Sequence, residues 1–504
     1  MKYILLSITL IIGINLSAQK SLRKKLKELD EYYEQAYKDW KVPGIAVAIV
    51  KDGEIIFAKG YGIRNLDTME EVDENTLFAI ASNSKAFTAA GLAILVDEGK
   101  ISWKDKVRKY LPWFELYSPY VSENFTIEDL LTHRSGLKTF SGDLLWYGTD
   151  HSREEIVRRA KHLEPAYGFR DAYGYSNIMY LTAGLIIEEV SGMSWDDFIT
   201  KNILEPLHMD RTLTSTNELS MMENFCAPHN DFQDSLITIE WLNWDNIAPA
   251  GALISSVNDI SKWLIFQLNQ GITPDGDTLI QKRRFQEMWA PHILQNVSSW
   301  SQRTWPSTHF KAYGYGFAMF DYLGKKVLGH GGGYDGFITN TTFVPEENLG
   351  FTILTNKNTS LYYPLKYKTL DVLLDADEET DWSGDFLALF AAKNAKEDSI
   401  PPPSNPTLDE EVYLGTYTCE MYGDAKVYKE DGKMMLHLLP TEIFVGELIH
   451  YQHNTWELEF AKVPSLPKGK VNFTIDIDGN IDEMQVDVPN PDFDFTELKF
   501  KKVK

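Results

Sequence analysis

Hydrophobic and polar positions near the start of the chain follow first a helical and then a strand-like pattern. Over residues 22–40, Leu, Tyr and Ala recur at helical spacing among many charged residues, which predicts an amphipathic helix. The β-rich runs 44–50 and 54–61 are joined by Lys51-Asp52-Gly53, a combination typical of a β-hairpin. From Ala81 to about Glu205 the pattern is mostly helical.

β-rich patterning returns after the helical region, over residues 313–320, 326–329, 337–344 and 349–355. The strands thus come from both ends of one region, and the helices come from its middle. A serial βαβ repeat would instead alternate helices with strands. The pattern therefore predicts an α/β domain whose sheet is built from the two ends of the region.

A change of composition near residue 400 predicts a domain boundary. Residues 396–406 are first charged and then rich in proline, as in a semi-rigid linker. Short strand-like runs follow, with turns at Asp431-Gly432 and Asp478-Gly479. We expect a small all-β domain of barrel type, with strands over residues 413–417, 426–428, 434–439, 455–460, 471–477 and 483–488.

The first residues are typical of a secretory signal. Lys2 supplies a positive charge, residues 4–16 are mostly apolar, and Leu16-Ser17-Ala18 offers small residues for cleavage. The apolar run is shorter than the roughly 20 residues that a membrane span needs. We expect residues 1–18 to be a signal peptide and the mature protein to be secreted or periplasmic; an uncleaved N-terminal anchor is the alternative.

The charge balance limits the partners of the protein. Among 504 residues, 49 are Lys or Arg and 73 are Asp or Glu, which gives a net charge of −24. Such a chain repels phosphate backbones and anionic headgroups, so we expect no nucleic-acid partner and no stable membrane insertion. Cys226 and Cys419 are predicted to be unpaired structural thiols, and no Cys/His spacing suits a zinc site.

Several common signatures are absent or misleading. The chain contains no G-x-S-x-G, H-E-x-x-H or G-x-x-x-x-G-K motif. Residues 331–336 match G-x-G-x-x-G, but β-branched and aromatic residues follow them. These residues predict a strand, whereas a dinucleotide site needs a helix at that point. We therefore expect no nucleotide cofactor.

An S-x-x-K motif at Ser82 and Lys85 offers nucleophilic chemistry. The motif occurs five times, but only this copy follows an apolar run and opens a helix-forming one. On a helix, this spacing places the lysine one turn after the serine on the same face. A lysine whose pKa is lowered by burial can remove the serine proton. The alternative is a helix-capping serine beside a solvated lysine.

Two further motifs each occur once. In Tyr175-Ser176-Asn177, a Y-x-N motif, the spacing in an extended loop aims both outer side chains to one side. A tyrosine beside a lysine can relay a proton, and an asparagine can hold a substrate amide. His330-Gly331-Gly332 is an H-x-G motif after a predicted strand, where glycines let a ligand approach the backbone. Taken singly, each motif would fit an ordinary structural role.

Together, S-x-x-K, Y-x-N and H-x-G resemble the serine β-lactamase and penicillin-binding-protein superfamily, in particular its class C-like serine hydrolases. Connecting segments such as Val42-Pro43-Gly44 and residues 130–137 resemble it too. The tail, with Tyr413-Leu414-Gly415-Thr416-Tyr417, resembles the lipocalin-like β-barrel appended to some of these hydrolases. The resemblance implies an antiparallel sheet flanked by helices plus an all-helical lobe. Together with the N-terminal signal and the proline-rich linker, it predicts four parts: a signal peptide (1–18), a hydrolase domain (22–375), a linker (376–407) and a barrel (408–504).

Carried over residue by residue, the resemblance implies a complete acyl-enzyme site. Ser82 would be the acylated nucleophile and Lys85 its base. Tyr175 would relay the proton, and Asn177 would orient the lysine and the substrate. No metal ion and no organic cofactor is implied. Substrate binding would come from His330 and Gly332 besides Asn177, and the oxyanion hole from the backbone N–H groups of Ser82 and Gly333.

The sequence departs from the family's β-lactamases at two positions. His330 stands where those enzymes carry the lysine of K-T-G, and Tyr167 replaces the proline before Gly168. A histidine is mostly neutral at pH 7, so it lacks the charge that holds a substrate carboxylate. Family members with H-x-G include esterases and D-amino-acid amidases or peptidases.

The prediction is therefore an exported serine hydrolase that acts through an acyl-enzyme on a small ester, amide or peptide, with β-lactam hydrolysis as a minor activity. A true class C-like β-lactamase and a non-catalytic peptidoglycan- or peptide-binding relative are the alternatives. Large aromatic residues between the motifs are expected mostly in the core, and a minority lining the cleft would favour an apolar or sugar-bearing acyl partner. They are Trp241, Trp244, Trp289, Trp300, Trp305, Tyr313 and Tyr315.

Overall fold

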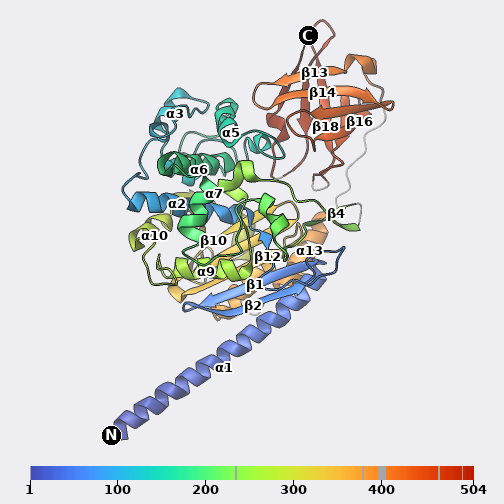
Figure 1. The fold of residues 1–504 in the computed structure, drawn as a ribbon. Coiled ribbons are helices and arrows are strands. Elements are labelled where there is room, and N and C mark those ends of the chain that lie inside the picture. Colours follow the sequence, from blue (N-terminus) through green and yellow to red (C-terminus); the bar gives the residue numbers. More distant parts are fainter. Residues whose placement is uncertain are drawn as a thin grey trace.

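The computed structural model describes residues 2–232, 235–376, 380–394, 404–463, 466–490 and 492–503, without the side chains of residues 2–19 and 391–394. Figure 1 shows a large α/β domain with a β-barrel beside its helical lobe. One eight-stranded sheet, in the order β2-β1-β12-β11-β10-β9-β8-β7, organises the α/β domain, and its neighbouring strands are antiparallel. Its strands are β1 (Gly44–Lys51), β2 (Glu54–Gly62), β7 (Ile293–Gln295), β8 (Lys311–Tyr313), β9 (Ala318–Tyr322), β10 (Lys325–Tyr334), β11 (Phe337–Val344) and β12 (Leu349–Thr355).

The middle of this sheet is buried on both faces. In β1, Val47 and Ile49 belong to one hydrophobic cluster, whereas Ala46 and Ala48 belong to another. Successive side chains of a strand point to opposite faces, so a strand covered on both sides needs apolar residues at every position. This explains why the run 44–50 is continuously apolar rather than alternating.

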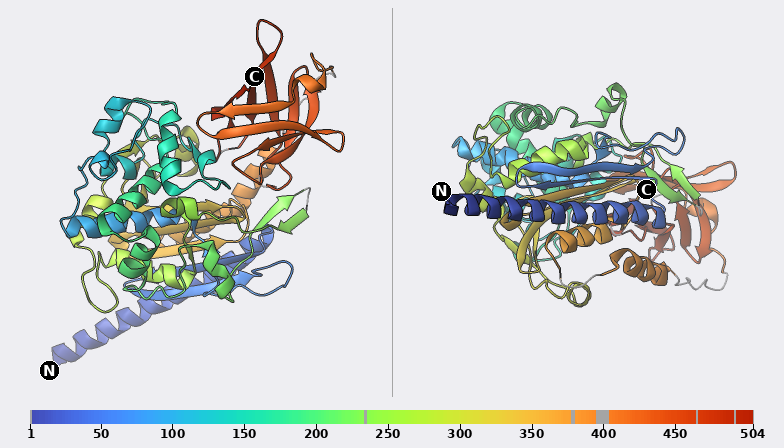
Figure 2. Two further views of the ribbon diagram at one scale, coloured as in Figure 1. Left: turned by 45° about the horizontal axis from the view of Figure 1, so that its top comes forward. Right: turned by 90° about the horizontal axis from the view of Figure 1, so that it is seen from below.

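Helices form a layer on each side of the sheet. The orange helices α12 and α13 lie on the side opposite to the green and light-blue helices (Figure 2). Leu29 and Tyr33 of α1 share a cluster with Leu365 and Leu370 of α12 and with Phe386 of α13. The antiparallel sheet flanked by helices is therefore confirmed. The covering helices are α1 (Lys2–Asp39), α12 (Tyr362–Leu373) and α13 (Trp382–Asn394) on one side, and α2 (Ser84–Asp97), α8 (Ala248–Gly251) and α9 (Val257–Leu268) on the other.

The helical lobe is built around α6 (Asn177–Ser191), which contacts most of its neighbours. Burial along α6 is continuous from Asn177 to Ile187, so this helix is surrounded by protein. A helix that is apolar on every side is stable only in such a core. Its neighbours in the lobe are α4 (Ile127–Leu131), α5 (Arg153–Arg159) and α7 (Trp195–Ile199), and the lobe also contains α3 (Pro119–Asn124).

The predicted strand over residues 313–320 is two strands, β8 and β9, joined by a tight turn. The Gly314 N–H donates to the Phe317 carbonyl, and Gly316 has a φ of +80°. A side chain at Gly316 would meet the Cα of Ala86 at 2.9 Å, so the glycine lets the turn lie against α2. The turn therefore brings the sheet into contact with the helix that carries Lys85.

Part of the predicted linker over residues 376–407 is helical. Helix α13 packs Trp382 and Phe386 into the cluster formed with α1 and α12. A proline-rich pattern identifies a stiff connection but gives no information about the residues before it. Residues 395–403, which contain the prolines from Pro401 to Pro403, lie outside the described residues.

The C-terminal domain is a closed barrel of eight strands, so the all-β barrel is confirmed. β16 and β20 were not predicted. Only Phe500 among the four residues of β20 is apolar, which leaves little alternation to recognise. The strands are β13 (Gly415–Cys419), β14 (Gly423–Glu430), β15 (Lys433–Leu438), β16 (Val445–Gln452), β17 (Thr455–Glu459), β18 (Gly469–Ile475), β19 (Ile481–Asp487) and β20 (Lys499–Lys502).

The predicted signal peptide, residues 1–18, lies outside the residues whose side chains are described. Within the described part of the chain, no helix combines the length and apolar character that a bilayer span requires.

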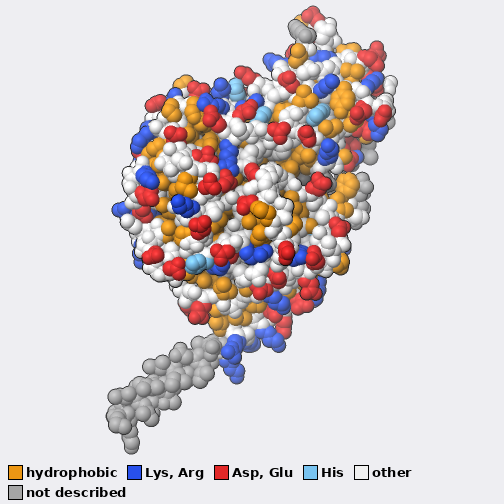
Figure 3. Space-filling model, in the orientation of Figure 1, with side chains coloured by type: hydrophobic (Ala, Val, Ile, Leu, Met, Phe, Trp, Pro, Cys, Tyr) orange, Lys and Arg blue, Asp and Glu red, His pale blue; other side chains and the backbone are white. Residues whose placement is uncertain are grey.

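Cys226 and Cys419 are both buried and free, as the sequence predicts. Acidic and basic side chains are intermixed over both domains on the face shown in Figure 3.

Candidate active site

Ser82 lies in a single 3₁₀ turn, Ala81–Asn83, directly before α2. Ala81 has a φ of +47°, a conformation that non-glycine residues rarely adopt and that functional turns often contain. The Asn83 amide fixes the turn by donating to the Ile80 carbonyl at 2.8 Å and to the Thr339 hydroxyl at 3.0 Å. The N-cap of α2 is Asn83 rather than Ser82, so the alternative of a helix-capping serine is wrong.

Lys85 is fully buried one turn into α2. Its Nζ lies 3.1 Å from Ser82 Oγ, 2.7 Å from Asn177 Oδ1 and 2.8 Å from the Ala250 carbonyl. Burial lowers the pKa of Lys85 well below its usual value, and the nearby Asp143 only partly opposes this. A neutral amine donates two hydrogen bonds and accepts one, so it can bond both carbonyl oxygens and accept the proton of Ser82.

Tyr175 adjoins the same pair. Its ring centroid is 4.7 Å from Lys85 Nζ. Burial raises the pKa of Tyr175 well above its usual value, and a hydrogen bond with Ser82 opposes this rise. The Tyr175 phenol is therefore protonated at neutral pH. It can pass its proton to a substrate if a neighbouring group replaces that proton, and the Lys85 amine is close enough to do so.

Asn177 begins α6 and connects Lys85 to a buried carboxylate. Its Nδ2 donates to Asp143 Oδ2 at 2.6 Å, so its Oδ1 must be the atom that accepts from Lys85. Trp146 Nε1 donates to the other oxygen of Asp143 at 2.9 Å. Burial raises the pKa of Asp143 to about 8. The sequence motifs did not indicate Asp143, because a single aspartate in a loop matches no pattern.

His330 of β10 is neutral and fixed by two hydrogen bonds. Its Nδ1 lies 2.5 Å from the Gly331 carbonyl, which only accepts, so Nδ1 carries the proton and Nε2 accepts from the Tyr313 hydroxyl at 2.9 Å. Burial, with help from the charge of Lys85, lowers the pKa of His330 to about 3. The residue that replaces the family lysine therefore brings no positive charge.

The glycines after His330 alternate between the pocket and the protein interior. β9 pairs with β10 only up to Gly329, so the edge beyond it is free of a neighbouring strand on that side. Gly331 and Gly333 are exposed and line the pocket, and Ser82 lines it too. A side chain at Gly332 would meet the Ile80 carbonyl at 2.2 Å. Gly332, predicted as a substrate contact, is thus buried against the Ser82 turn.

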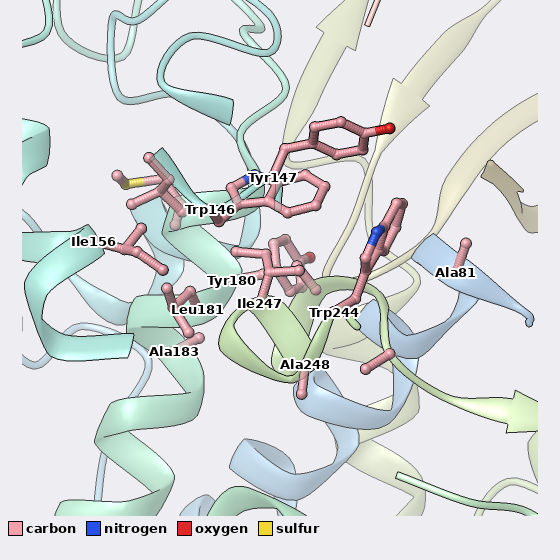
Figure 4. Packing of buried hydrophobic residues seen from close by; sticks show 14 of the residues in the cluster. Ala81, Trp146, Tyr147, Ile156, Tyr180, Leu181, Ala183, Trp244, Ile247 and Ala248 are labelled. Atoms are coloured by element: carbon pink, nitrogen blue, oxygen red, sulfur yellow. The ribbon is translucent and has the colours of Figure 1, made fainter. Parts of the chain in front are cut away.

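The pocket around these residues has a volume of about 950 Å³. Of the aromatic residues singled out above, Trp244 lines it; Trp289 and Trp305 are buried, and Trp300 is 37% exposed. Trp146 packs against Tyr147 and against Trp244, with ring centroids 5.8 and 4.8 Å apart (Figure 4). Aromatic side chains therefore form part of the pocket wall.

The barrel contributes one side of the pocket. Leu466, Asn490, Asp492 and Phe493 line it, and the ring of Phe493 lies 4.3 Å from that of Tyr147. The sequence did not indicate these contacts, because they join segments that are hundreds of residues apart. The site is thus formed by both domains.

Within the described part of the chain, the acidic residues that line the pocket are Asp143, Asp335 and Asp492. No lysine or arginine in that part of the chain lines it, since Lys85 is buried behind Ser82 and Asn177. The described residues also contain no cluster of three or more His, Cys, Asp or Glu that could hold a metal ion. The site offers a nucleophile, a base, hydrogen-bond donors and aromatic surface.

Comparison with known proteins agrees with this geometry. The Beta-lactamase family matches residues 29–373, and a domain of unknown function, DUF3471, matches residues 400–502. The chain is 31% identical over 449 residues to the unguisins hydrolase ungD' of Aspergillus campestris (strain IBT 28561), covering 82% of this chain and 79% of that protein. It is 29% identical over 343 residues to Protein flp of Staphylococcus aureus (strain N315), covering 67% of this chain and 64% of flp.

Among solved structures, the octameric penicillin-binding protein homologue from Pyrococcus abyssi shares the fold. Its TM-score is 0.62 at 23% identity, covering 95% of this chain and 100% of that one. The family match spans well over half of the 504 residues and includes the S-x-x-K motif at Ser82, the Y-x-N motif and the H-x-G motif. This chain is therefore a serine hydrolase that belongs to the beta-lactamase family and carries an eight-stranded C-terminal barrel.

Proposed function

We propose that the protein hydrolyses uncharged esters or amides, including peptides, through a covalent acyl-enzyme on Ser82. The observation that carries this proposal is the fully buried Lys85, whose amine lies 3.1 Å from the Ser82 hydroxyl. Burial favours the neutral amine, which is the form that can act as a base. A binding protein without activity would gain nothing from burying a lysine at the pocket serine.

Acylation follows from these positions. Lys85 takes the Ser82 proton as Oγ bonds to the substrate carbonyl carbon, and the backbone N–H groups of Ser82 and Gly333 stabilise the resulting oxyanion. Tyr175 gives its proton to the leaving alcohol or amine and regains one from the Lys85 ammonium, while the carbon–leaving-group bond breaks. In deacylation, water gives a proton to the Tyr175–Lys85 pair as its oxygen bonds to the acyl carbon. The bond between that carbon and Ser82 Oγ then breaks, and the pair returns the proton to Oγ, which releases the acid and restores the Ser82 hydroxyl.

Three features support an uncharged substrate. His330 is neutral, no lysine or arginine of the described residues lines the pocket, and aromatic side chains form part of its wall. A carboxylate in this pocket would have to be desolvated without a cationic partner. β-Lactam hydrolysis is therefore proposed as a minor activity, and a specialised class C-like β-lactamase is less well supported. A relative named an unguisins hydrolase agrees with a hydrolytic role.

We also propose that the protein is exported and that its barrel is lipocalin-like. Export is supported by Lys2 and the apolar run after it. The barrel proposal is supported by its eight strands and full closure, which lipocalins share.

The decisive experiment replaces the nucleophile. Ser82→Ala should reduce ester hydrolysis by at least about 10³-fold and abolish labelling by a fluorophosphonate, because the proposed acyl-enzyme forms on the Ser82 hydroxyl. Ser135→Ala, which alters the serine of another S-x-x-K motif, is the matched control and should keep its turnover. Intact mass and peptide mapping should place the label on Ser82. Labelling elsewhere, or turnover preserved in Ser82→Ala, would contradict the proposal.

A further inference from the structure

The loop of residues 138–149 lies between the barrel and the catalytic residues. At one end, Lys138 pairs with Asp494 of the barrel at 2.6 Å. At the other end, Thr149 forms a β-bridge with Thr441 of the barrel. The middle of the loop carries Asp143, whose carboxylate accepts from Asn177. The barrel therefore holds the loop that reaches the site.

Glu497 contacts the two residues that directly precede Asp143. It ends the 3₁₀ turn Phe495–Glu497, in which Phe495 is buried. Its Oε2 accepts from the Gly142 N–H at 2.8 Å, and its Oε1 accepts from the buried Ser141 hydroxyl. Gly142, with a φ of +79°, directly precedes Asp143. One barrel carboxylate thus fixes the backbone that positions Asp143.

Hydrogen bonds continue from Asp143 to the nucleophile. Asp143 Oδ2 accepts from Asn177 Nδ2 at 2.6 Å, Asn177 Oδ1 accepts from Lys85 Nζ at 2.7 Å, and Nζ lies 3.1 Å from Ser82 Oγ. The two oxygens of Asp143 accept from Asn177 and Trp146, so its position is determined on both sides. The path from the barrel to Ser82 therefore consists of short contacts throughout.

We propose that Glu497 of the barrel is a positioning residue for the catalytic lysine and acts through Ser141, Gly142, Asp143 and Asn177. This inference rests on the proposed role of Ser82 and Lys85. Docking of the barrel then determines both the position of Asp143 and the charge near it. Lys85 is therefore the strongest catalyst of Ser82 deprotonation only when the barrel is docked on the hydrolase domain.

The electrostatic effect has a definite direction. Asp143 and Lys85 share a buried site, so a proton on Asp143 leaves Lys85 neutral, whereas a proton on Lys85 leaves Asp143 anionic. The negative charge of Glu497 disfavours the anionic form of Asp143 and raises its pKa. Glu497 therefore favours the neutral amine that removes the Ser82 proton.

Other titratable groups near this network do not change their charge around neutral pH. Burial lowers the pKa of His133 and His330 and raises that of Tyr175 and Tyr180, the groups that face Lys85 besides Asp143. Asp494 and Lys138 face Glu497 and pair with each other. A shift in the pH profile of the variants below therefore reports on Asp143, Lys85 and Glu497.

The test is the pH dependence of kcat/KM for a small uncharged ester, measured with the full chain. Glu497→Gln keeps an acceptor for the Gly142 N–H but removes the charge. We expect its acid limb to move to higher pH by roughly half a unit to one unit, with kcat/KM at neutral pH reduced several-fold and recovered at higher pH. Asp143→Asn removes the anion itself, so its acid limb should move to lower pH.

Lys499→Gln is the matched control. It breaks the exposed barrel–hydrolase pair of Lys499 with Glu164 at 2.6 Å. This pair lies outside the hydrogen bonds that connect Glu497 to Lys85, so the pH profile of the variant should stay unchanged. If Glu497→Gln lowers activity equally at every pH, or leaves the profile unchanged, the inference is wrong. If Asp143→Asn fails to fold, the pH profile of Glu497→Gln alone still tests the inference. If Ser82→Ala keeps its activity, the proposed function itself fails, which is a separate outcome.

Discussion

The two walls of the pocket are built differently. On the hydrolase side, Ser82, Lys85, Asn177 and His330 are held by buried hydrogen bonds on a turn, two helices and a strand. On the barrel side, Phe493 and its neighbours come from loops between strands. Catalytic groups must be held at fixed distances from one another, whereas the sequence of a loop can change without disturbing the strands that it connects. This difference suggests that the hydrolase wall determines the reaction and the barrel wall determines which acyl groups fit.

Replacing His330 by lysine tests the hydrolase wall. A lysine would supply the missing charge for a substrate carboxylate, and such a charge-assisted contact contributes roughly 1.5–3 kcal/mol when well placed. Lys85 is close enough to lower the pKa of His330. Repulsion between Lys85 and a lysine at position 330 would therefore cancel part of this stabilisation. We expect the ratio of kcat/KM for a carboxylate-bearing cephalosporin to that for an uncharged ester to rise about tenfold.

The comparison requires both substrates on both proteins, and only the ratio is interpreted. His330 also accepts a hydrogen bond from Tyr313, so its replacement will lower both rates. Tyr313→Phe removes that bond without adding charge and is the matched control. Efficient cephalosporin turnover by the unmodified enzyme would show that the carboxylate is held elsewhere and would favour the β-lactamase alternative.

The hydrolase wall could be largely predicted from the sequence, whereas the barrel wall could not. Ser82 and Lys85 lie three positions apart on one helical segment, and family motifs connect them to Tyr175 and His330, so the predicted catalytic residues meet in the structure. Glu497 bonds to Gly142, 355 positions away in the chain. No local pattern encodes such a contact, because it depends on how two folded domains dock.

Phe493→Ala tests the barrel wall. Phe493 is partly buried and packs on Tyr147, so its removal should cost about 1 kcal/mol of contact with a bulky acyl group, or roughly fivefold in kcat/KM. An acetyl ester carries the smallest acyl group of the series, so we expect its hydrolysis to change least. A series of p-nitrophenyl esters from acetate to phenylbutyrate measures this dependence.

Tyr428→Ala is the control for that series, because it removes another barrel aromatic, on β14, that does not line the described pocket. Equal loss for all esters in Phe493→Ala would mean that Phe493 supports the reaction itself rather than selecting the acyl group. No loss for any ester would mean that bound acyl groups do not touch the barrel.

The smallest expected effect concerns how the two walls are held together. Burial raises the pKa of Asp494, but hydrogen bonds from Lys138 and Thr496 outweigh it and hold the pKa below its usual value. Stability from this group is therefore present above the pKa of an unfolded aspartate and is lost as the pH falls through the folded-state pKa. Because Lys138 is 58% exposed, solvent screening limits the pair to no more than about 1 kcal/mol.

Asp494→Asn should thus lower the melting temperature by no more than about 2 °C at neutral pH, and the difference from the unmodified protein should vanish on acidification. Thermal unfolding of both proteins across this pH range measures the effect. A much larger loss at neutral pH would show that Asp494 anchors the barrel strongly. The ion pair would then add substantially to the contacts that Glu497 and Thr441 make with the loop of residues 138–149, and the barrel could not be treated as the more variable wall.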